Sequence, residues 1–313
     1  MKTKKIFLAV GAVLALAGAS AHATTVLFDH DQNGAFSQAS GFDWFPGNAL
    51  SVDSLTDGQL NVGDVFTTYY QAELGSFSGA GNTSLPVGNA GPYEYTGIAV
   101  IQEEVTFVAD TNGDGVQDLV KFKHVGGTFK MYYDDLGGTT NADGITGNTG
   151  LGYDDGQLIL TANVTLGGAN FTLADPLNTD LLDKFGADDL GGIQTVVGNG
   201  NTNVEGPVTF VDSNFLKGIN PGESIVKLFW DSTLAAPFDS INPETSIVGQ
   251  TPNYGPDNLN GPSVGAQGNE DFHFEADGNM SVETKTTVPE PASLALVSLG
   301  LLGMGAVSRK KKA

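Results

Sequence analysis

The sequence predicts an all-β domain, an antiparallel β-sandwich or jelly-roll-like fold with one or two short helices. Many segments alternate polar and apolar residues or are rich in β-branched and aromatic residues, which is typical of strands. Glycine accounts for 43 of the 313 residues, and stretches rich in Gly, Asn and Thr separate the segments as turns do. Many short strands with such turns favour a two-layer antiparallel architecture.

The predicted elements follow one another with Gly-rich connections. Strands are expected over residues 60–74, 95–109, 118–125, 128–133, 157–173, 206–212, 224–230 and 271–275. Turns are expected over residues 81–92, 138–150 and 198–207. One short helix is expected over residues 179–185, ended by Gly186. Residues 248–269 are rich in Gly, Pro and Asn and predict a long irregular loop.

The two ends of the chain differ from this pattern. Residues 1–23 predict a signal peptide, because three lysines precede an apolar run and Ala21 and Ala23 form an A-x-A cleavage site. At the other end a Pro-Glu-Pro tripeptide precedes the uncharged apolar stretch 292–307 and four cations. As a helix that stretch would cover about 24 Å, which makes it a short transmembrane segment. Because the cations lie on the terminal side of both apolar segments, we expect both termini in the cytoplasm and the region between them outside.

That region is strongly acidic. Seven of the 14 Lys and Arg residues lie in the terminal segments, which leaves seven against 36 Asp and Glu and a net charge of −29. Such a surface repels nucleic acid and suits divalent cations and neutral or cationic partners. The same charge would also simply keep an extracellular protein soluble. The chain has no cysteine, which excludes disulfides, thiol catalysis and cysteine-based metal sites.

The tripeptide Pro289, Glu290 and Pro291, the short apolar segment and the basic tail together resemble the PEP-CTERM sorting signal of Gram-negative, exopolysaccharide-producing bacteria. The resemblance implies that an exosortase recognises the tripeptide and removes the tail, so that the inner membrane holds the chain only transiently. The expected organisation is therefore a signal peptide (1–23), an exported β-rich domain (24–283), a tether (284–288) and a sorting signal (289–313).

Three internal stretches extend this resemblance to the flocculation-associated PEP-CTERM proteins. They read FDWFPGNAL at 42–50, YDDGQLIL at 153–160 and DFHFEADGN at 271–279. The class implies export to the cell surface or the medium, C-terminal processing and a role alongside exopolysaccharide. It implies no catalytic residues.

Residues 110–118 are the best candidate metal site. They read DTNGDGVQD, the first nine positions of an EF-hand-type calcium loop, and the expected ligands are Asp110, Asn112, Asp114, the Val116 carbonyl and Asp118. Position twelve is Lys121 where a bidentate Glu belongs, so we expect a weak structural Ca²⁺ site with a Kd of about 10⁻⁴ to 10⁻³ M. The alternative is a polar hairpin turn. Residues 29–34 (DHDQNG) repeat the start of the pattern more weakly, and residues 141–144 more weakly still.

No catalytic constellation stands out, so we expect no enzymatic activity. The histidines are far apart in sequence, and the GPSVG of residues 261–265 lacks the strand and the helix that a nucleophile elbow requires. Trp44 is a candidate for stacking on sugar rings, as are the adjacent tyrosines at 69–70 and 132–133, with core packing as the alternative. One tyrosine of each pair is expected inside, because neighbours on a strand point to opposite faces.

These observations predict a secreted or surface-displayed matrix protein that promotes cell aggregation, as flocs or biofilm, together with exopolysaccharide. Binding would be multivalent and non-catalytic, with exopolysaccharide or other copies of the protein as partners and calcium as a weak bridge. The alternatives are a polysaccharide-active enzyme and a carbohydrate-binding module on a jelly-roll scaffold.

Overall fold

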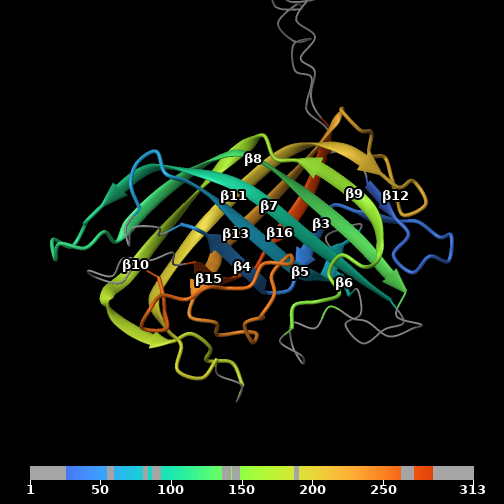
Figure 1. Cartoon of the computed structure of the whole chain (residues 1–313). Coiled ribbons are helices and arrows are strands. Elements are labelled where there is room, and N and C mark those ends of the chain that lie inside the picture. Colours follow the sequence, from blue (N-terminus) through green and yellow to red (C-terminus); the bar gives the residue numbers. More distant parts are fainter. Residues whose placement is uncertain are drawn as a thin grey trace, which may run out of the picture. The chain divides into compact units, whose positions relative to one another are not determined.

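The computed structural model describes residues 26–54, 60–79, 84–86, 93–135, 142, 149–186, 190–261 and 271–284. All of them lie in one compact unit, Ala23–Thr284. These residues form strands and no helix, which confirms the predicted all-β antiparallel fold (Figure 1). Within these ranges no helix has the length and apolar character needed to cross a bilayer. The predicted transmembrane segment, 292–307, lies outside them.

In chain order, the strands are β1 (Val26–Phe28), β2 (Ser37–Ala39), β3 (Gly41–Trp44), β4 (Gly47–Val52), β5 (Val65–Ser78), β6 (Ser84–Pro86), β7 (Tyr93–Ala109), β8 (Leu119–Asp135), β9 (Gln157–Asn163), β10 (Leu166–Leu181), β11 (Gln194–Val211), β12 (Leu216–Lys217), β13 (Ser224–Ala236), β14 (Leu259–Asn260), β15 (Phe272–Ala276) and β16 (Asn279–Thr284).

The large sheet closes on itself through its hydrogen-bonded pairings. The ring of neighbours is β5, β7, β8, β9, β11, β13, β16 and β3, and β3 pairs with β5 again. Strand β10 joins β8 to β11 on one side, while β4 and β15 join β5 to β13 on the other. A separate three-stranded sheet has the order β12-β1-β2. Among these strands every pairing is antiparallel except that of β11 with β14.

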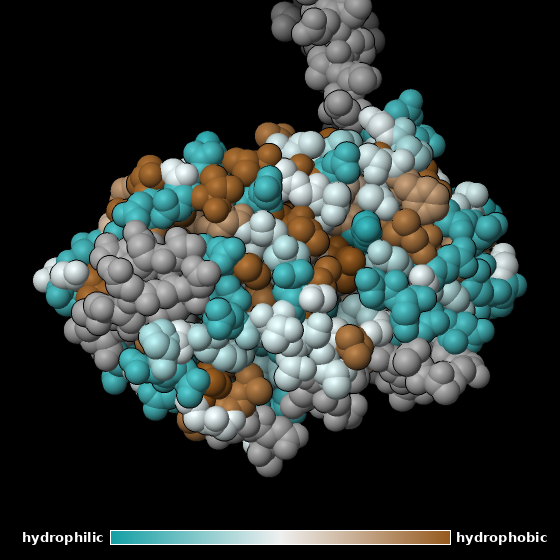
Figure 2. Space-filling view, in the orientation of Figure 1, coloured by the Kyte–Doolittle hydropathy of each residue, from teal (hydrophilic) through white to brown (hydrophobic). Residues whose placement is uncertain are grey.

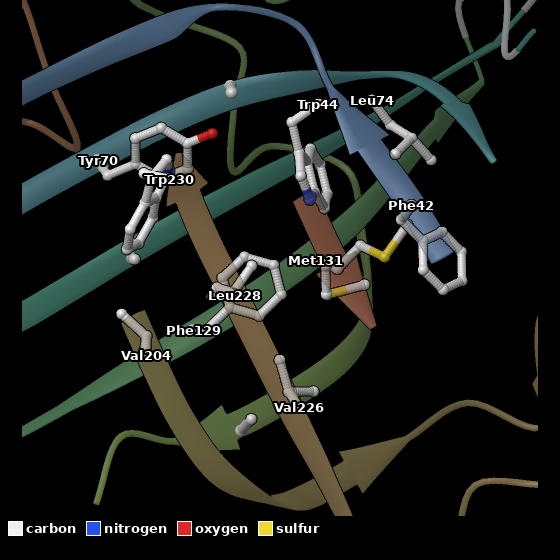
Figure 3. Close-up of a cluster of buried hydrophobic side chains, with 14 of the residues drawn as sticks. Phe42, Trp44, Tyr70, Leu74, Phe129, Met131, Val204, Val226, Leu228 and Trp230 are labelled. Atoms are coloured by element: carbon white, nitrogen blue, oxygen red, sulfur yellow. The ribbon is translucent and has the colours of Figure 1, made fainter. Parts of the chain in front are cut away.

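The core lies between opposite sides of this ring. Trp44 on β3 packs edge-on against Phe129 on β8, and Tyr70 on β5 packs edge-on against Trp230 on β13 (Figure 3). Aliphatic side chains fill the space around these four rings; they include Leu74, Met131, Val204, Val226 and Leu228. The chain has no cysteine, so burial of these large side chains, at roughly 1.5–3 kcal/mol each, holds the domain together without disulfides.

Most predicted strands are confirmed, with changed boundaries. The segments expected over 118–125 and 128–133 form one long strand, β8. The segment expected over 157–173 divides into β9 and the start of β10. The predicted loop at 248–269 is irregular in its described part, 248–261, apart from the two-residue strand β14.

The turn predicted over 198–207 is wrong, because this segment is the middle of β11. Its alternate residues Gly198, Gly200 and Thr202 face inward, and the asparagines between them are exposed. A Cβ atom at Gly198 would lie 2.6 Å from the Phe171 ring, so glycine is required for the two strands to approach. The segment therefore has the period of a strand, but its inward residues are small rather than apolar.

The helix predicted over 179–185 is also wrong. Residues Thr179, Asp180 and Leu181 end β10 and pair with β11. Beyond them, the Leu182 amide donates to the Ile193 carbonyl (3.1 Å), and the Lys184 amide donates to the Phe238 carbonyl (2.9 Å). Partners distant in sequence thus satisfy the main chain, and tertiary context overrides the local propensity.

Candidate functional site

The loop of residues 110–118 joins β7 to β8, and its side chains organise its own main chain. The Asp110 carboxylate accepts hydrogen bonds from the amides of Gly113 (2.6 Å) and Gly115 (2.9 Å). Asn112 Oδ1 accepts from the Asp114 amide (2.9 Å), and Asp114 Oδ1 accepts from the Val116 amide (2.8 Å). Oxygen donors at alternating positions therefore lie on a tightly wound loop, as a calcium loop requires.

Asp118 closes this loop. Its side chain is only 3% exposed, and its two oxygens accept from the Thr111 amide and the Thr111 hydroxyl, at 2.8 Å each. These hydrogen bonds lower the pKa of the Asp118 carboxyl. Asp118 thus braces the loop in addition to the ligand role predicted for it. Lys121, at position twelve, extends over the Phe107 ring, 5.5 Å from its centroid.

The donor chemistry of the loop fits a hard cation. Asp110, Asn112 and Asp114 are exposed, and each carries at least one side-chain oxygen, the atom that Ca²⁺ prefers. In the part of the chain that the structure describes, no group of three or more His, Cys, Asp or Glu side chains is arranged to hold a metal. A cation here would therefore depend also on the Asn112 amide and on main-chain carbonyls such as that of Val116.

The predicted sugar-stacking role of Trp44 does not fit its position. The side chain is 2% exposed, and its ring lies 5.9 Å from that of Phe129. A ring enclosed in the core presents no face to an external sugar. At 69–70 one tyrosine is buried and its neighbour is half-buried, as expected. At 132–133 both tyrosines pack, because Tyr132 is covered by a second cluster on the outer side of the sheet.

His273 is a structural residue. It is fully buried, with Nε2 2.8 Å from Asn48 Oδ1 and Nδ1 3.1 Å from the Tyr254 hydroxyl. Burial lowers the pKa of His273 to about 3, so the ring is neutral at physiological pH. Phe272 and Phe274 lie on the opposite face of β15, as the alternation predicts, and pack toward the main core. The histidine holds an irregular segment against the outside of β4 and β15.

Glu244 is also a structural residue that holds segments of the chain together. Its carboxylate is fully buried and accepts from the Gln71 amide group (2.5 Å) and the Tyr153 hydroxyl (2.6 Å), while its own main-chain amide donates to Asn48. Gln71 also donates to the carbonyls of Gly150 and Ser246, at 3.0 Å each. These contacts attach two irregular segments to the sheet.

A second buried polar chain crosses four strands. The Ser51 hydroxyl lies 2.8 Å from that of Thr68, which donates to Glu103, and Glu103 lies 3.2 Å from His124 Nε2. All four side chains are less than a tenth exposed. No local pattern in the sequence predicts this cluster, since its members come from β4, β5, β7 and β8 and meet only through strand register.

Several predicted site residues lie outside the described residues. They are Ala21, Ala23, Pro289, Glu290 and Pro291, together with residues 262–265 of the GPSVG stretch and all of residues 141–144 except Ala142.

Comparison with known proteins identifies one feature. Residues 287–311 match the PEP-CTERM protein-sorting motif. No curated protein and no solved structure matches the chain. The match covers the tripeptide, the apolar segment and most of the basic tail.

Proposed function

We propose that this chain promotes cell aggregation at the surface of a Gram-negative bacterium, to which its PEP-CTERM sorting motif directs exosortase-dependent export. It acts as a matrix protein of flocs or biofilm, together with exopolysaccharide. The observation that carries the proposal is the sorting motif at residues 287–311, because it delivers the β-rich domain to the place where cells meet.

The charge of the domain supports a bridging role. Whole-chain net charge is −22 even with the basic ends included, so direct contact with an acidic polymer or a sister molecule is repulsive. A divalent cation shared between two acidic partners would turn this repulsion into attraction. The exposed loop of residues 110–118 is the proposed place for that cation. Such contacts are individually weak, but many copies on one cell gain through avidity.

We propose that the binding is non-catalytic. Catalytic acids and bases must reach the substrate. The buried candidates, His273, Glu244, Glu103 and His124, instead bind other protein groups inside the fold. Their arrangement supports a role in holding segments and strands together.

A carbohydrate-binding module is the second candidate. The partly exposed rings of Tyr93 and Tyr133 favour it, with centroids 6.0 Å apart and planes inclined by 31°. Rings so placed could contact a sugar. This candidate predicts saturable binding of a defined glycan that Tyr93→Ala weakens at least tenfold, whereas the aggregation proposal requires no such ligand.

Deletion of the gene tests the proposal. We expect the deletion strain to lose flocs or biofilm while it produces as much exopolysaccharide as its parent, and we expect the intact gene to restore aggregation. Normal flocs in the deletion strain would contradict the proposal. Changed polymer yield or polymer length would favour an enzyme.

A further inference from the structure

The loop that follows β1, residues 29–35, has an internal hydrogen-bond framework of its own. Asp29 Oδ2 accepts from the Gly34 amide (2.9 Å), and Asn33 Oδ1 accepts from the Ala35 amide (2.7 Å). The Asp31 carboxylate accepts from the amide and the side chain of Asn33, at 3.4 and 2.6 Å. Three oxygen-bearing side chains at alternating positions thus surround one short loop.

This framework repeats that of residues 110–118 position by position. In both loops the first Asp accepts from the glycine amide five residues later at 2.9 Å. In both, the oxygens at the third and fifth positions accept from the amide two residues later. The sixth residue has positive φ in each case, 86° at Gly34 and 91° at Gly115. The two loops come from unrelated parts of the chain, so the shared geometry reflects the shared D-x-(D/N)-x-(N/D)-G pattern.

A second, independent observation distinguishes the loop at 29–35. Asp29 is 3% exposed, and its Oδ1 atom is buried without a hydrogen-bond partner. The other oxygen of the same carboxylate is fixed by Gly34, so the group is turned toward the loop. A buried carboxylate oxygen without a hydrogen-bond partner destabilises the fold. A bound cation would supply the missing partner.

The core holds this loop in place. The Tyr95 hydroxyl donates to the main-chain carbonyls of Asp29 (3.3 Å) and His30 (3.0 Å), and the Asp29 amide donates to the Phe215 carbonyl (3.0 Å). Tyr95 is 1% exposed and packs edge-on against Phe28. A ligand set attached to a rigid core in this way needs little ordering when a cation binds.

We propose that residues 29–35 form a second site for a divalent cation of the calcium class. Its ligands are Oδ1 of Asp29, the Asp31 carboxylate, Oδ1 of Asn33 and the main-chain carbonyl of Ala35. The donors are all oxygen and include only two carboxylates, which corresponds to binding in the millimolar range.

The two loops lie at opposite ends of one long strand. Tyr95, near the start of β7, contacts the loop at 29–35, and the loop at 110–118 follows the end of β7 at Ala109 (Figure 1). At about 3.3 Å per residue the strand separates them by up to about 46 Å. Figure 1 draws the segment after β1 in blue, and in the same place Figure 2 shows mainly hydrophilic side chains. Cation sites at both ends would let one molecule bridge two partners; this consequence rests on the proposed function, whereas cation binding itself does not.

Calcium binding to the full chain, purified in a mild detergent, tests the second site. Equilibrium dialysis at millimolar calcium is expected to give two bound ions. Asp31→Asn and Asp114→Asn are each expected to remove one ion or to weaken it at least tenfold, and the double variant to remove both. Asp257→Asn, which removes an exposed charge outside both loops, is the matched control. A single ion that Asp31→Asn leaves unchanged would overturn the proposal.

Asp29→Asn provides a second measurement. The asparagine oxygen still accepts from Gly34, while an amide replaces the unpartnered Oδ1. We expect a Tm at or above that of the wild type in EDTA, and a smaller rise of Tm on addition of calcium. An equal fall of Tm under both conditions would show a purely structural role and would overturn the site. Cell aggregation is scored separately, so that two bound ions without aggregation would reject the proposed function and retain the site.

Discussion

The Trp44 and Phe129 rings meet edge to face across the core, with centroids 5.9 Å apart and planes inclined by 78°. Trp44 lies on β3 and Phe129 on β8, strands that are not neighbours in the sheet, so the contact ties opposite sides of the ring together. The stretch FDWFPGNAL, in which Trp44 occurs, therefore carries a core residue of this fold.

Trp44→Ala is expected to destabilise the domain by about 3–5 kcal/mol, because it leaves a cavity where a 2%-exposed indole stood. Denaturant unfolding measures this change. Phe107→Ala, which truncates a 44%-exposed ring, should cost much less and serves as the control. A stable Trp44→Ala protein that has lost only glycan binding would support the stacking role instead.

Gly198→Val is expected to destabilise the domain by at least about 1–3 kcal/mol, because the new Cβ would lie 2.6 Å from the Phe171 ring. Asn199→Val, one residue along on the exposed face of β11, should change stability by no more than about 0.5 kcal/mol. The two unfolding curves give the comparison. Equal effects would contradict the inward orientation of Gly198.

Glu94 predicts a fall of stability as the pH rises from about 4.5 to about 8. Burial raises the pKa of Glu94 from 4.5 to about 8, so between these values the folded state binds more protons than the unfolded state. The free energy of unfolding therefore decreases as pH rises through this window, by at most about 1.4 kcal/mol per pH unit. His273 acts in the opposite direction, but only below its ordinary pKa of 6.5.

Glu94→Gln is therefore expected to flatten the decline between pH 6.5 and 8, because glutamine does not titrate in this range. The substitution keeps the local structure, since the glutamine oxygen still accepts the hydrogen bond from the Ala142 amide (2.9 Å). Unfolding measured at both pH values provides the check, with Glu223→Gln as an exposed control. A variant that retains the wild-type slope would exclude Glu94 as its source.

In the loop at 110–118, we expect different roles for two aspartates. Asp118 holds the loop together, and Asp114 binds the cation. Asp118→Ala is expected to lower the Tm in EDTA, because the Thr111 amide and hydroxyl lose their acceptors. Asp114→Ala is expected to change the calcium-free Tm little and to remove part of the calcium-induced rise. Scanning calorimetry with and without calcium measures both. An identical response of the two variants would contradict this division of roles.

The strands of this fold can be predicted from the sequence where their inward positions are apolar. Val226, Leu228 and Trp230 are such inward positions, and the segment expected over 224–230 forms part of β13. The middle of β11 was missed because glycine and threonine occupy its inward positions, a composition that is also typical of turns. The segment 179–185 was missed because its main-chain partners, Ile193 and Phe238, are distant in sequence.

The candidate sites also differ in whether the local sequence or long-range packing determines them. A local pattern such as D-x-N-x-D-G can be read from the chain, because its hydrogen bonds join residues within five positions of one another. The burial of Trp44, the unpartnered oxygen of Asp29 and the chain from Ser51 to His124 depend on how segments distant in sequence pack together. None of these has a signature in the local sequence.

Addition of the purified protein to cells of the deletion strain tests the central claim most directly. The settled fraction of cells should rise with the amount of protein bound per cell and level off at full coverage, while the length of the exopolysaccharide stays the same. Cells that remain dispersed at full coverage, or polymer that is shortened by trace amounts of the protein, would contradict an adhesive role at the cell surface.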